Sequence, residues 1–175
     1  MIDVLTRAAD YAVAAHGDQK YGDAPYSLHL SQVAYLVDLA VPNDPEMVEA
    51  AWLHDVLEDT PATFNELEKL FGPRVAGLVF AVTGEGKNRK ERSASVLRKI
   101  QAYGGKPCRG LGKDAAILKL CDRLANVTSC VFHGNKSLLQ MYWNEWPAMM
   151  KAFEPFDSHW LFVALHDEFV KGGLG

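Results

Sequence analysis

The sequence is poor in cysteine and has no long apolar run. Its three cysteines, Cys108, Cys121 and Cys130, are odd in number, and no two have the C-x-x-C spacing. We therefore expect neither a disulfide scaffold nor a C-x-x-C zinc or redox site. This usage fits a reducing compartment, and we predict a cytoplasmic location. No apolar run approaches the roughly 20 residues that span a bilayer, and the N-terminus lacks the basic-then-apolar pattern of a signal peptide.

The sequence also lacks an excess of basic residues. Its 18 lysines and arginines are outnumbered by 22 acidic residues, giving a net charge of -4, which argues against a nucleic-acid coat or a membrane-surface binder. A small anionic substrate remains compatible, because it needs only a local group of cations. Hydrophobic residues make up 49% of the chain, which indicates a globular protein, and 175 residues suit a single domain over residues 1–175.

Apolar residues recur with helical periodicity along almost the whole chain, so an all-α fold is predicted. Residues 17–27 and 84–92, rich in glycine or in polar and basic residues, are expected to be loops. No run alternates for long enough to predict a strand. The expected helices include Val4 to Val13 and cover about residues 29–40, 45–59, 63–72, 73–82, a segment that ends at 104, 114–132, and two more separated near Pro155.

Residues 50–59, AAWLHDVLED, place four ionisable side chains directly after four apolar ones. Burying charges without partners is very costly, so this abrupt change needs an explanation. On a helix, His54 and Glu58 lie one turn apart, and Asp55 and Asp59 form a second such pair. One interpretation is a metal bound by His54 and Asp55, with the two later carboxylates in reach of its water. The other is a solvent-facing helix end with a chance group of acids.

Residues 115–127, AAILKLCDRLANV, form an apolar segment with Asp122 at its centre. Lys119, Asp122, Arg123 and Asn126 share one helix face by their spacing. A metal-binding aspartate beside cations that receive phosphate is one interpretation, since arginine makes forked phosphate contacts and lysine acts as a point charge. An internal ion pair on a solvated stripe is the alternative.

Residues 16–29, HGDQKYGDAPYSLH, place a histidine at each end of a loop that contains glycine and proline. His29, at the start of the next predicted helix, is positioned to offer an imidazole to a metal. A single histidine in such a place is more often a hydrogen-bonded structural residue.

Taken together and in order, the three segments resemble the HD superfamily, and within it the hydrolase domain of the RelA/SpoT family. That pattern is H-x-x-Q, PY-x-x-H, HD-x-x-ED and K-L-x-D-R-L-x-N, and this chain has it at residues 16–19, 25–29, 54–59 and 119–126. The family's FG and VT pairs also occur, at 71–72 and 82–83. The match extends over about residues 5–130.

The resemblance implies an all-α HD-domain helical bundle with a bound metal ion. The implied ligands are His29, His54, Asp55 and Asp122. Glu58 and Asp59 would position or activate the attacking water. The metal is usually Mn²⁺ in that family, and a set of two imidazoles and two carboxylates also suits Fe, Zn or Mg. The implied substrate is the nucleotide (p)ppGpp, cleaved at its 3′-pyrophosphate, and the length matches a hydrolase domain without a synthetase region.

The expected substrate-binding residues are cations and neighbouring polar groups. They are Lys20, Tyr21, Arg89, Lys90, Lys119, Arg123 and Asn126. For Arg89 and Lys90, a solvated charge run is an equal alternative. In the family an Arg-Lys pair precedes Pro-Tyr, and its arginine stacks on guanine, whereas Lys20-Tyr21-Gly22 stands here. Tyr21 would stack on a base itself or be a surface aromatic.

We therefore predict a metal-dependent phosphohydrolase of a small nucleotide, with (p)ppGpp as the first candidate substrate. The alternatives are an HD phosphohydrolase that acts on another nucleotide such as NADPH, a non-catalytic nucleotide sensor, and a structural helical protein. The predicted partner is the small-molecule substrate, with no nucleic acid and no membrane. The sequence leaves the oligomeric state open.

Overall fold

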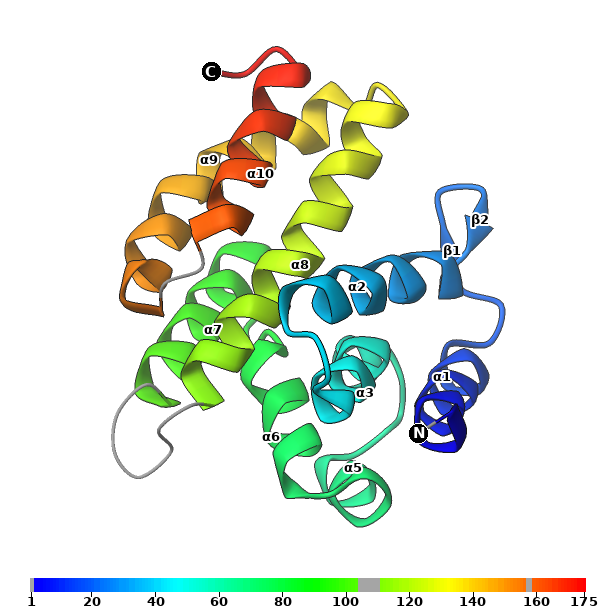
Figure 1. The fold of residues 1–175 in the computed structure, drawn as a ribbon. Helices are drawn as coiled ribbons and strands as arrows, with labels where there is room; N and C mark the ends of the chain where they lie inside the picture. Colours follow the sequence, from blue (N-terminus) through cyan, green and yellow to red (C-terminus); the bar gives the residue numbers. More distant parts are fainter. Residues whose placement is uncertain (1, 104–110, 157–158) are drawn as a thin grey trace.

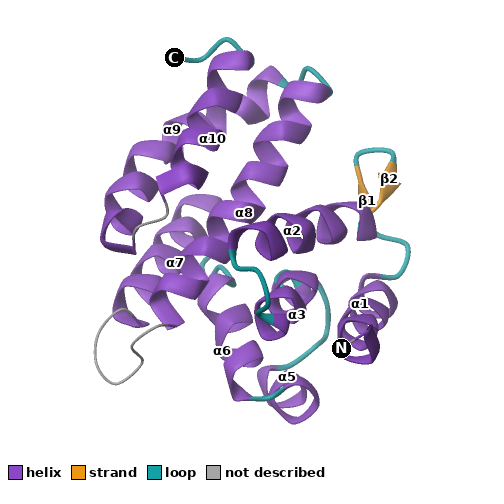
Figure 2. Ribbon diagram, viewed as in Figure 1, coloured by secondary structure: helices purple, strands orange, loops and turns teal. Residues whose placement is uncertain are grey.

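The protein is almost entirely helical, as the periodicity predicted (Figures 1 and 2). The computed structural model describes residues 2–103, 111–156 and 159–175. The helices are α1 (Ile2–His16), α2 (Ser27–Ala40), α3 (Pro45–Leu53), α4 (Val56–Asp59), α5 (Phe64–Phe71), α6 (Pro73–Val82), α7 (Arg89–Tyr103), α8 (Leu111–Phe132), α9 (Lys136–Phe153), the 3₁₀ turn η1 (Glu154–Phe156) and α10 (His159–Lys171).

The long helix α8 runs through the middle of the molecule (Figure 1). It contacts α2, α3 and α6 on one side and α7, α9 and α10 on the other. Most of its side chains are buried, including Leu118, Leu120 and Cys121, and so are the charged residues Asp122 and Arg123. Because a buried charge is stable only with partners, the middle of α8 must be surrounded by groups that compensate it.

Local sequence signals fix several helix starts. The Thr63 side chain accepts a hydrogen bond from the Glu66 backbone N–H at 3.3 Å, which confirms the predicted start of α5. Asp44 caps α3 in the same way, and Pro45 takes the first helical position. The Arg74 guanidinium binds the carboxylates of Asp44 and Asp114, so the first turns of α3, α6 and α8 are tied together.

The helix predicted over residues 45–59 is wrong at one point, because it is broken between α3 and α4. The His54 ring Nδ1 hydrogen-bonds to the carbonyl oxygen of Ala51 at 2.8 Å, and in an unbroken helix that oxygen accepts from the Asp55 N–H. Asp55 has φ −103° and ψ −3°, displaced from the α-helical mean of about −63° and −42°. The break directs Glu58 and Asp59 differently from a continuous helix.

The predicted loop 17–27 contains a small hairpin that the sequence did not indicate. Strands β1 (Lys20–Tyr21) and β2 (Ala24–Pro25) pair antiparallel, and Gly22 at the turn has φ +61°, a conformation that favours glycine. The hairpin projects beside α2 (Figure 2).

The C-terminal region forms two helices separated around Pro155, as predicted. Trp146 and Phe153 of α9 and Phe169 of α10 are buried in the core. Helix α8 begins at Leu111, three residues before its predicted start. Most of the residues between the predicted helix that ends at 104 and the one that starts at 114 lie outside the described residues, and so does Cys108.

Candidate metal centre

The predicted metal ligands meet where α2, the break between α3 and α4, and α8 come together. His29 Nε2 lies 3.3 Å from Asp122 Oδ1, and His54 Nε2 lies 3.7 Å from the same oxygen. One ligand atom from each of these three residues lies within 4.8 Å of the other two. All three side chains are buried, with relative exposures of 1%, 1% and 6% for His29, His54 and Asp122.

Asp55 completes this cluster from a more exposed position. Its Oδ2 lies 3.0 Å from His54 Nε2 and 3.8 Å from His29 Nε2. The Tyr26 hydroxyl donates a hydrogen bond to the same oxygen at 2.5 Å. Burial and the nearby Asp55 raise the pKa of Tyr26, so its hydroxyl stays neutral and remains a donor.

The potential metal-donor atoms of the cluster face one another at short distances. A carbonyl oxygen only accepts, so the hydrogen of a neutral His54 ring must be on Nδ1, facing Ala51. His54 Nε2 then points a lone pair at two carboxylates. Within the described part of the chain, this buried nitrogen has no hydrogen bond of good geometry.

The electrostatics of the cluster favour a positive charge at its centre. Burial alone would lower the pKa of His54, but the carboxylates of Asp55 and Asp122 outweigh burial and raise it to about 10. The pKa of Asp122 is held well below its usual range, because Lys119 and the two histidines outweigh the effect of burial. A divalent cation would meet the same demand with two charges, in place of the proton. Two imidazoles and two carboxylates therefore fit such an ion.

Asp122 is also held from outside the cluster. Lys119 Nζ lies 2.8 Å from its Oδ2, and the Asn126 side-chain amide donates to its Oδ1 at 2.6 Å. Groups of this kind orient metal ligands and adjust their basicity. Three of the residues that shared a face in the sequence analysis thus interact directly.

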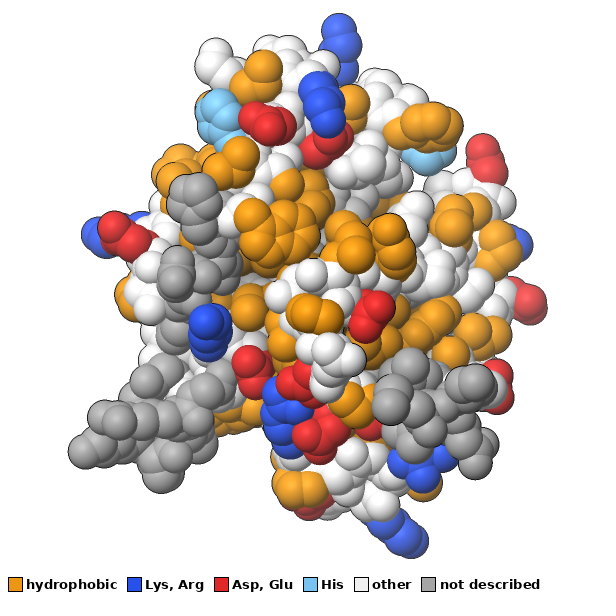
Figure 3. All heavy atoms as spheres, in the orientation of Figure 1, with side chains coloured by type: hydrophobic (Ala, Val, Ile, Leu, Met, Phe, Trp, Pro, Cys, Tyr) orange, Lys and Arg blue, Asp and Glu red, His pale blue; other side chains and the backbone are white. Residues whose placement is uncertain are grey.

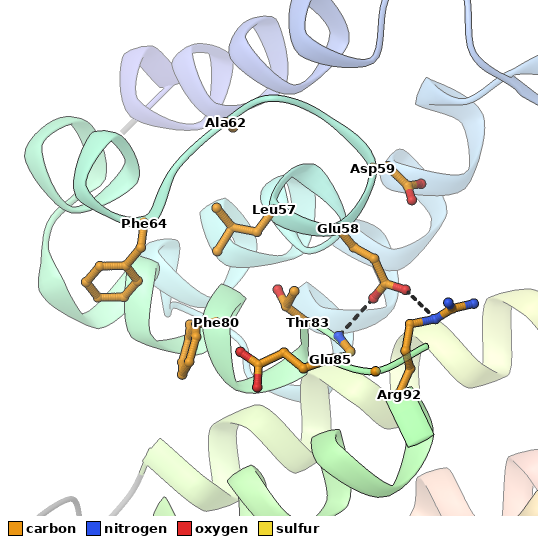
Figure 4. A pocket seen from close by; sticks show the side chains of 11 residues that line it. Leu57, Glu58, Asp59, Ala62, Phe64, Phe80, Thr83, Glu85 and Arg92 are labelled. Carbon is orange, nitrogen blue, oxygen red and sulfur yellow. Dashed lines mark hydrogen bonds and ion pairs between the residues drawn. The ribbon is translucent and has the colours of Figure 1, made fainter. Parts of the chain in front are cut away.

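Glu58 lies at one side of a pocket of about 660 Å³ that Phe64 and Phe80 border at the other (Figure 4). Its Oε2 accepts from the Gly84 backbone N–H at 2.9 Å, and Oε1 is 3.3 Å from Arg92 Nε. A Cβ atom at Gly84 would lie 2.7 Å from the Arg92 Cβ, so only glycine fits this close approach. The loop after α6 thus fixes the carboxylate that the sequence singled out.

Asp59 is oriented by the H-x-x-Q motif, for which the sequence analysis gave no role. His16 Nδ1 is hydrogen-bonded to Gln19 Oε1 at 2.8 Å, and Gln19 Nε2 donates to Asp59 Oδ2 at 2.9 Å. His16 is buried and stacks on Tyr26. The motif therefore connects α1 to the second predicted catalytic acid.

Cations gather on the other side of Glu58, around a small pocket of about 100 Å³. It is lined by Glu58, Gly84, Arg89, Arg92, Ser93, Val96, Leu97, Lys119, Arg123, Glu145 and Met149. Glu145 binds both Arg89 and Arg123, each at 2.8 Å. Both guanidinium groups also lie over the Tyr142 ring, at 5.0 and 4.4 Å from its centroid.

Glu145 is a site residue that the sequence analysis missed. The two arginines outweigh burial and lower its pKa, so it stays ionised between them. In contrast, Lys20 and Lys90 are exposed, and neither is among the residues that line the pockets described here. The structure therefore brings Arg89, Arg123 and Lys119 to the cluster of cations but leaves these two lysines at the surface.

A larger pocket of about 940 Å³ opens beside Tyr21, between α2, α8 and α10. Its lining includes the apolar residues Leu28, Leu36, Leu124 and Phe132. Figure 3 shows apolar side chains exposed on this face of the molecule. Helix α8 thus contributes to both pockets, with Lys119 and Arg123 lining the pocket of cations and Leu124 and Phe132 lining the apolar pocket.

No described helix is both long and apolar enough to cross a membrane.

Residues 8–137 match the HD domain family. The chain is 40% identical over 137 residues to the guanosine-3′,5′-bis(diphosphate) 3′-pyrophosphohydrolase of Aquifex aeolicus, covering 75% of this chain and 18% of that protein. It is 36% identical over 121 residues to the Drosophila melanogaster protein named guanosine-3′,5′-bis(diphosphate) 3′-pyrophosphohydrolase MESH1, covering 67% of this chain and 64% of that protein. The chain therefore spans less than two thirds of the length of these curated relatives.

The fold is also similar to a solved structure of a metazoan orthologue of SpoT, which is described as hydrolysing ppGpp and as having a role in starvation responses. The TM-score is 0.72 at 26% sequence identity, with 98% of this chain and 97% of that chain covered. The similarity thus includes α9 and α10, which lie beyond the residues that carry the motifs.

Proposed function

Because the chain belongs to the HD domain family, we propose that it is a metal-dependent nucleotide phosphohydrolase that converts guanosine 3′,5′-bis(diphosphate) to GDP and pyrophosphate. The observation that carries the proposal is the convergence of two buried histidines and two aspartates beside a cluster of arginine and lysine side chains. The names of the relatives support the choice of substrate.

We assign His29, His54, Asp55 and Asp122 as the metal ligands. The donor set fits Mn²⁺, which is our first candidate, with Fe, Zn and Mg as alternatives. When bound, the ion would polarise a phosphoryl oxygen and lower the pKa of water beside it. The ligand positions themselves are fixed by this chain, through the Tyr26 hydroxyl on Asp55 and the Asn126 amide on Asp122.

We assign the proton transfer, the orientation of water and the charge neutralisation to the remaining residues of the site. Glu58, held by the Gly84 N–H, would accept a proton from the water that attacks the 3′ phosphorus, and Asp59, held by Gln19, would orient that water. The bond from phosphorus to the ribose 3′ oxygen breaks, and that oxygen takes up a proton. Lys119, Arg89 and Arg123 would neutralise the negative charge on the pyrophosphoryl group while it is transferred to water.

The apolar pocket beside Tyr21 is our candidate site for the nucleoside. It adjoins the metal centre through Tyr21, which contacts His29, and its lining suits a planar base. Its volume of about 940 Å³ exceeds that of one base, so a dinucleotide such as NADPH is the second candidate substrate.

The proposal is tested by measuring pyrophosphate and phosphate release from ppGpp, GTP, GDP and NADPH, with Mn²⁺ and with a chelator. We expect pyrophosphate release from ppGpp that chelation abolishes and Mn²⁺ restores. Turnover of NADPH in place of ppGpp would retain the metal chemistry and reject the alarmone. No metal-dependent turnover of any of these nucleotides would support a nucleotide sensor instead.

Gly84→Ala should lower kcat by about 10- to 100-fold, because small displacements of a catalytic group cost rate steeply. The new Cβ would lie 3.2 Å from Glu58 Oε2 and 2.7 Å from the Arg92 Cβ, so the loop or the carboxylate must shift. Gly77→Ala, within α6, is the matched control: its Cβ would lie 3.4 Å from Leu111 Cδ2 of α8, an ordinary contact. Steady-state kinetics and thermal melts compare the two variants, and an unchanged kcat for Gly84→Ala would show that the loop does not position Glu58.

A further inference from the structure

Tyr21 contacts the metal centre from the β hairpin rather than standing free as a stacking surface. Its ring lies face to face with the His29 ring, with centroids 4.7 Å apart and an angle of 21° between the planes. Its hydroxyl donates to Asn126 Oδ1 at 2.9 Å.

The two acceptor oxygens of Asp122 decide which way the Asn126 amide points, and the hydrogen bond from Tyr21 holds the amide in that orientation. With Oδ1 occupied by the tyrosine hydroxyl, Nδ2 faces Asp122 and donates to its Oδ1 at 2.6 Å and to its backbone carbonyl at 3.0 Å. A reversed amide would place the Asn126 oxygen against an oxygen of Asp122 at both of its contacts with that residue. Tyr21 therefore acts on two candidate ligands, directly on His29 and through Asn126 on Asp122.

We propose that Tyr21 is a positioning residue of the metal centre, which holds the His29 ring by stacking and orients Asp122 through Asn126. The inference rests on the proposed metal site. It gives Tyr21 a role that differs from base stacking, since one ring face is already covered by His29. Tyr21 also lines the apolar pocket, so one side chain connects the candidate nucleoside site with the metal ligands.

The test is calorimetric titration of the full chain with Mn²⁺ alone, without nucleotide. Partners of metal ligands typically contribute 10- to 100-fold to metal affinity, so Tyr21→Phe should weaken Mn²⁺ binding by about 10-fold and Tyr21→Ala by about 100-fold. Tyr11→Phe is the matched control, because Tyr11 also packs on an aromatic ring, Phe71, and hydrogen-bonds a side chain, Glu66, away from the cluster. We expect this control to bind Mn²⁺ as the wild type does.

A second variant separates the action through Asn126 from general damage to the fold. In an Asn126→Ala background, Tyr21→Phe should cause no further loss of Mn²⁺ affinity, because the hydroxyl then has no amide to orient. Equal Mn²⁺ affinity of wild type and Tyr21→Phe, or additive losses in the double variant, would overturn the role of Tyr21 and leave the proposed function intact. A wild-type chain that binds no Mn²⁺ would overturn both.

Discussion

Asp122→Asn is expected to reduce metal-dependent pyrophosphate release by roughly 10³-fold or more, which corresponds to about 4 kcal/mol of transition-state stabilisation. The amide removes the negative charge that His29, His54 and Lys119 all face. Two imidazoles and one remaining carboxylate then hold the divalent ion more weakly. The measurement is kcat/KM for ppGpp over a range of Mn²⁺ concentrations, together with a direct Mn²⁺ titration.

The control for this variant is Asp114→Asn on the same helix. Asp114 is ion-paired with Arg74 near the start of α8, so its loss tests removal of an aspartate charge away from the cluster. We expect its activity to stay within about twofold of wild type, as for a partly exposed ion pair. If Asp122→Asn also retained activity and Mn²⁺ binding, Asp122 would be only the ion-pair partner of Lys119, the alternative that the sequence left open.

The helices were predictable because their apolar periodicity and start signals agree along most of the chain. The α5 start at Thr63 and the separation of the last two helices near Pro155 were both found in this way. The break at His54 and Asp55 was not, because every residue in 50–59 is compatible with a helix by propensity. It depends on one side-chain hydrogen bond from His54 to a backbone carbonyl, which the pattern does not show.

The cluster of candidate metal ligands was predictable from ordered motifs, whereas Glu145 in the neighbouring group of cations was not. His29, His54 and Asp122 are 25 and 68 residues apart in sequence, and the family resemblance alone indicated that they meet. Glu145 lies in an aromatic-rich segment, and its two arginine partners are 22 and 56 residues away. Such ion pairs are set by helix packing, so a single sequence gives no signal for them.

The contacts of Tyr21 were also not predictable from the sequence. The sequence raised two roles, base stacking, which stays a prediction, and a surface aromatic; it did not indicate that the half-buried ring stacks on His29. The hairpin that carries it has only two residues in each strand, too short for any periodicity to detect.

Glu58→Gln should lower kcat by about 10² to 10⁴-fold while leaving ppGpp binding nearly unchanged, as expected when a general base is lost. The substitution keeps the shape of the side chain, and its amide oxygen can still accept from the Gly84 N–H. What is lost is a group that takes a proton from water, and this loss affects the transition state rather than the bound substrate. Single-turnover rates and a ppGpp binding titration with Mn²⁺ measure the two effects separately.

Glu46→Gln supplies the matched control, because Glu46 is also paired with an arginine, Arg74 at 2.9 Å, away from the cluster. Glu46→Gln should leave both kcat and KM unchanged. This comparison shows whether the effect of Glu58→Gln comes from losing a base or only from losing the partner of an arginine. If Glu58→Gln kept full turnover, Asp59 would become the candidate base, and Asp59→Asn should then show the loss in its place. Weaker ppGpp binding with an unchanged kcat would instead mean that Glu58 serves to hold Arg92 for the phosphates, since an interaction made equally in both states changes KM and not kcat.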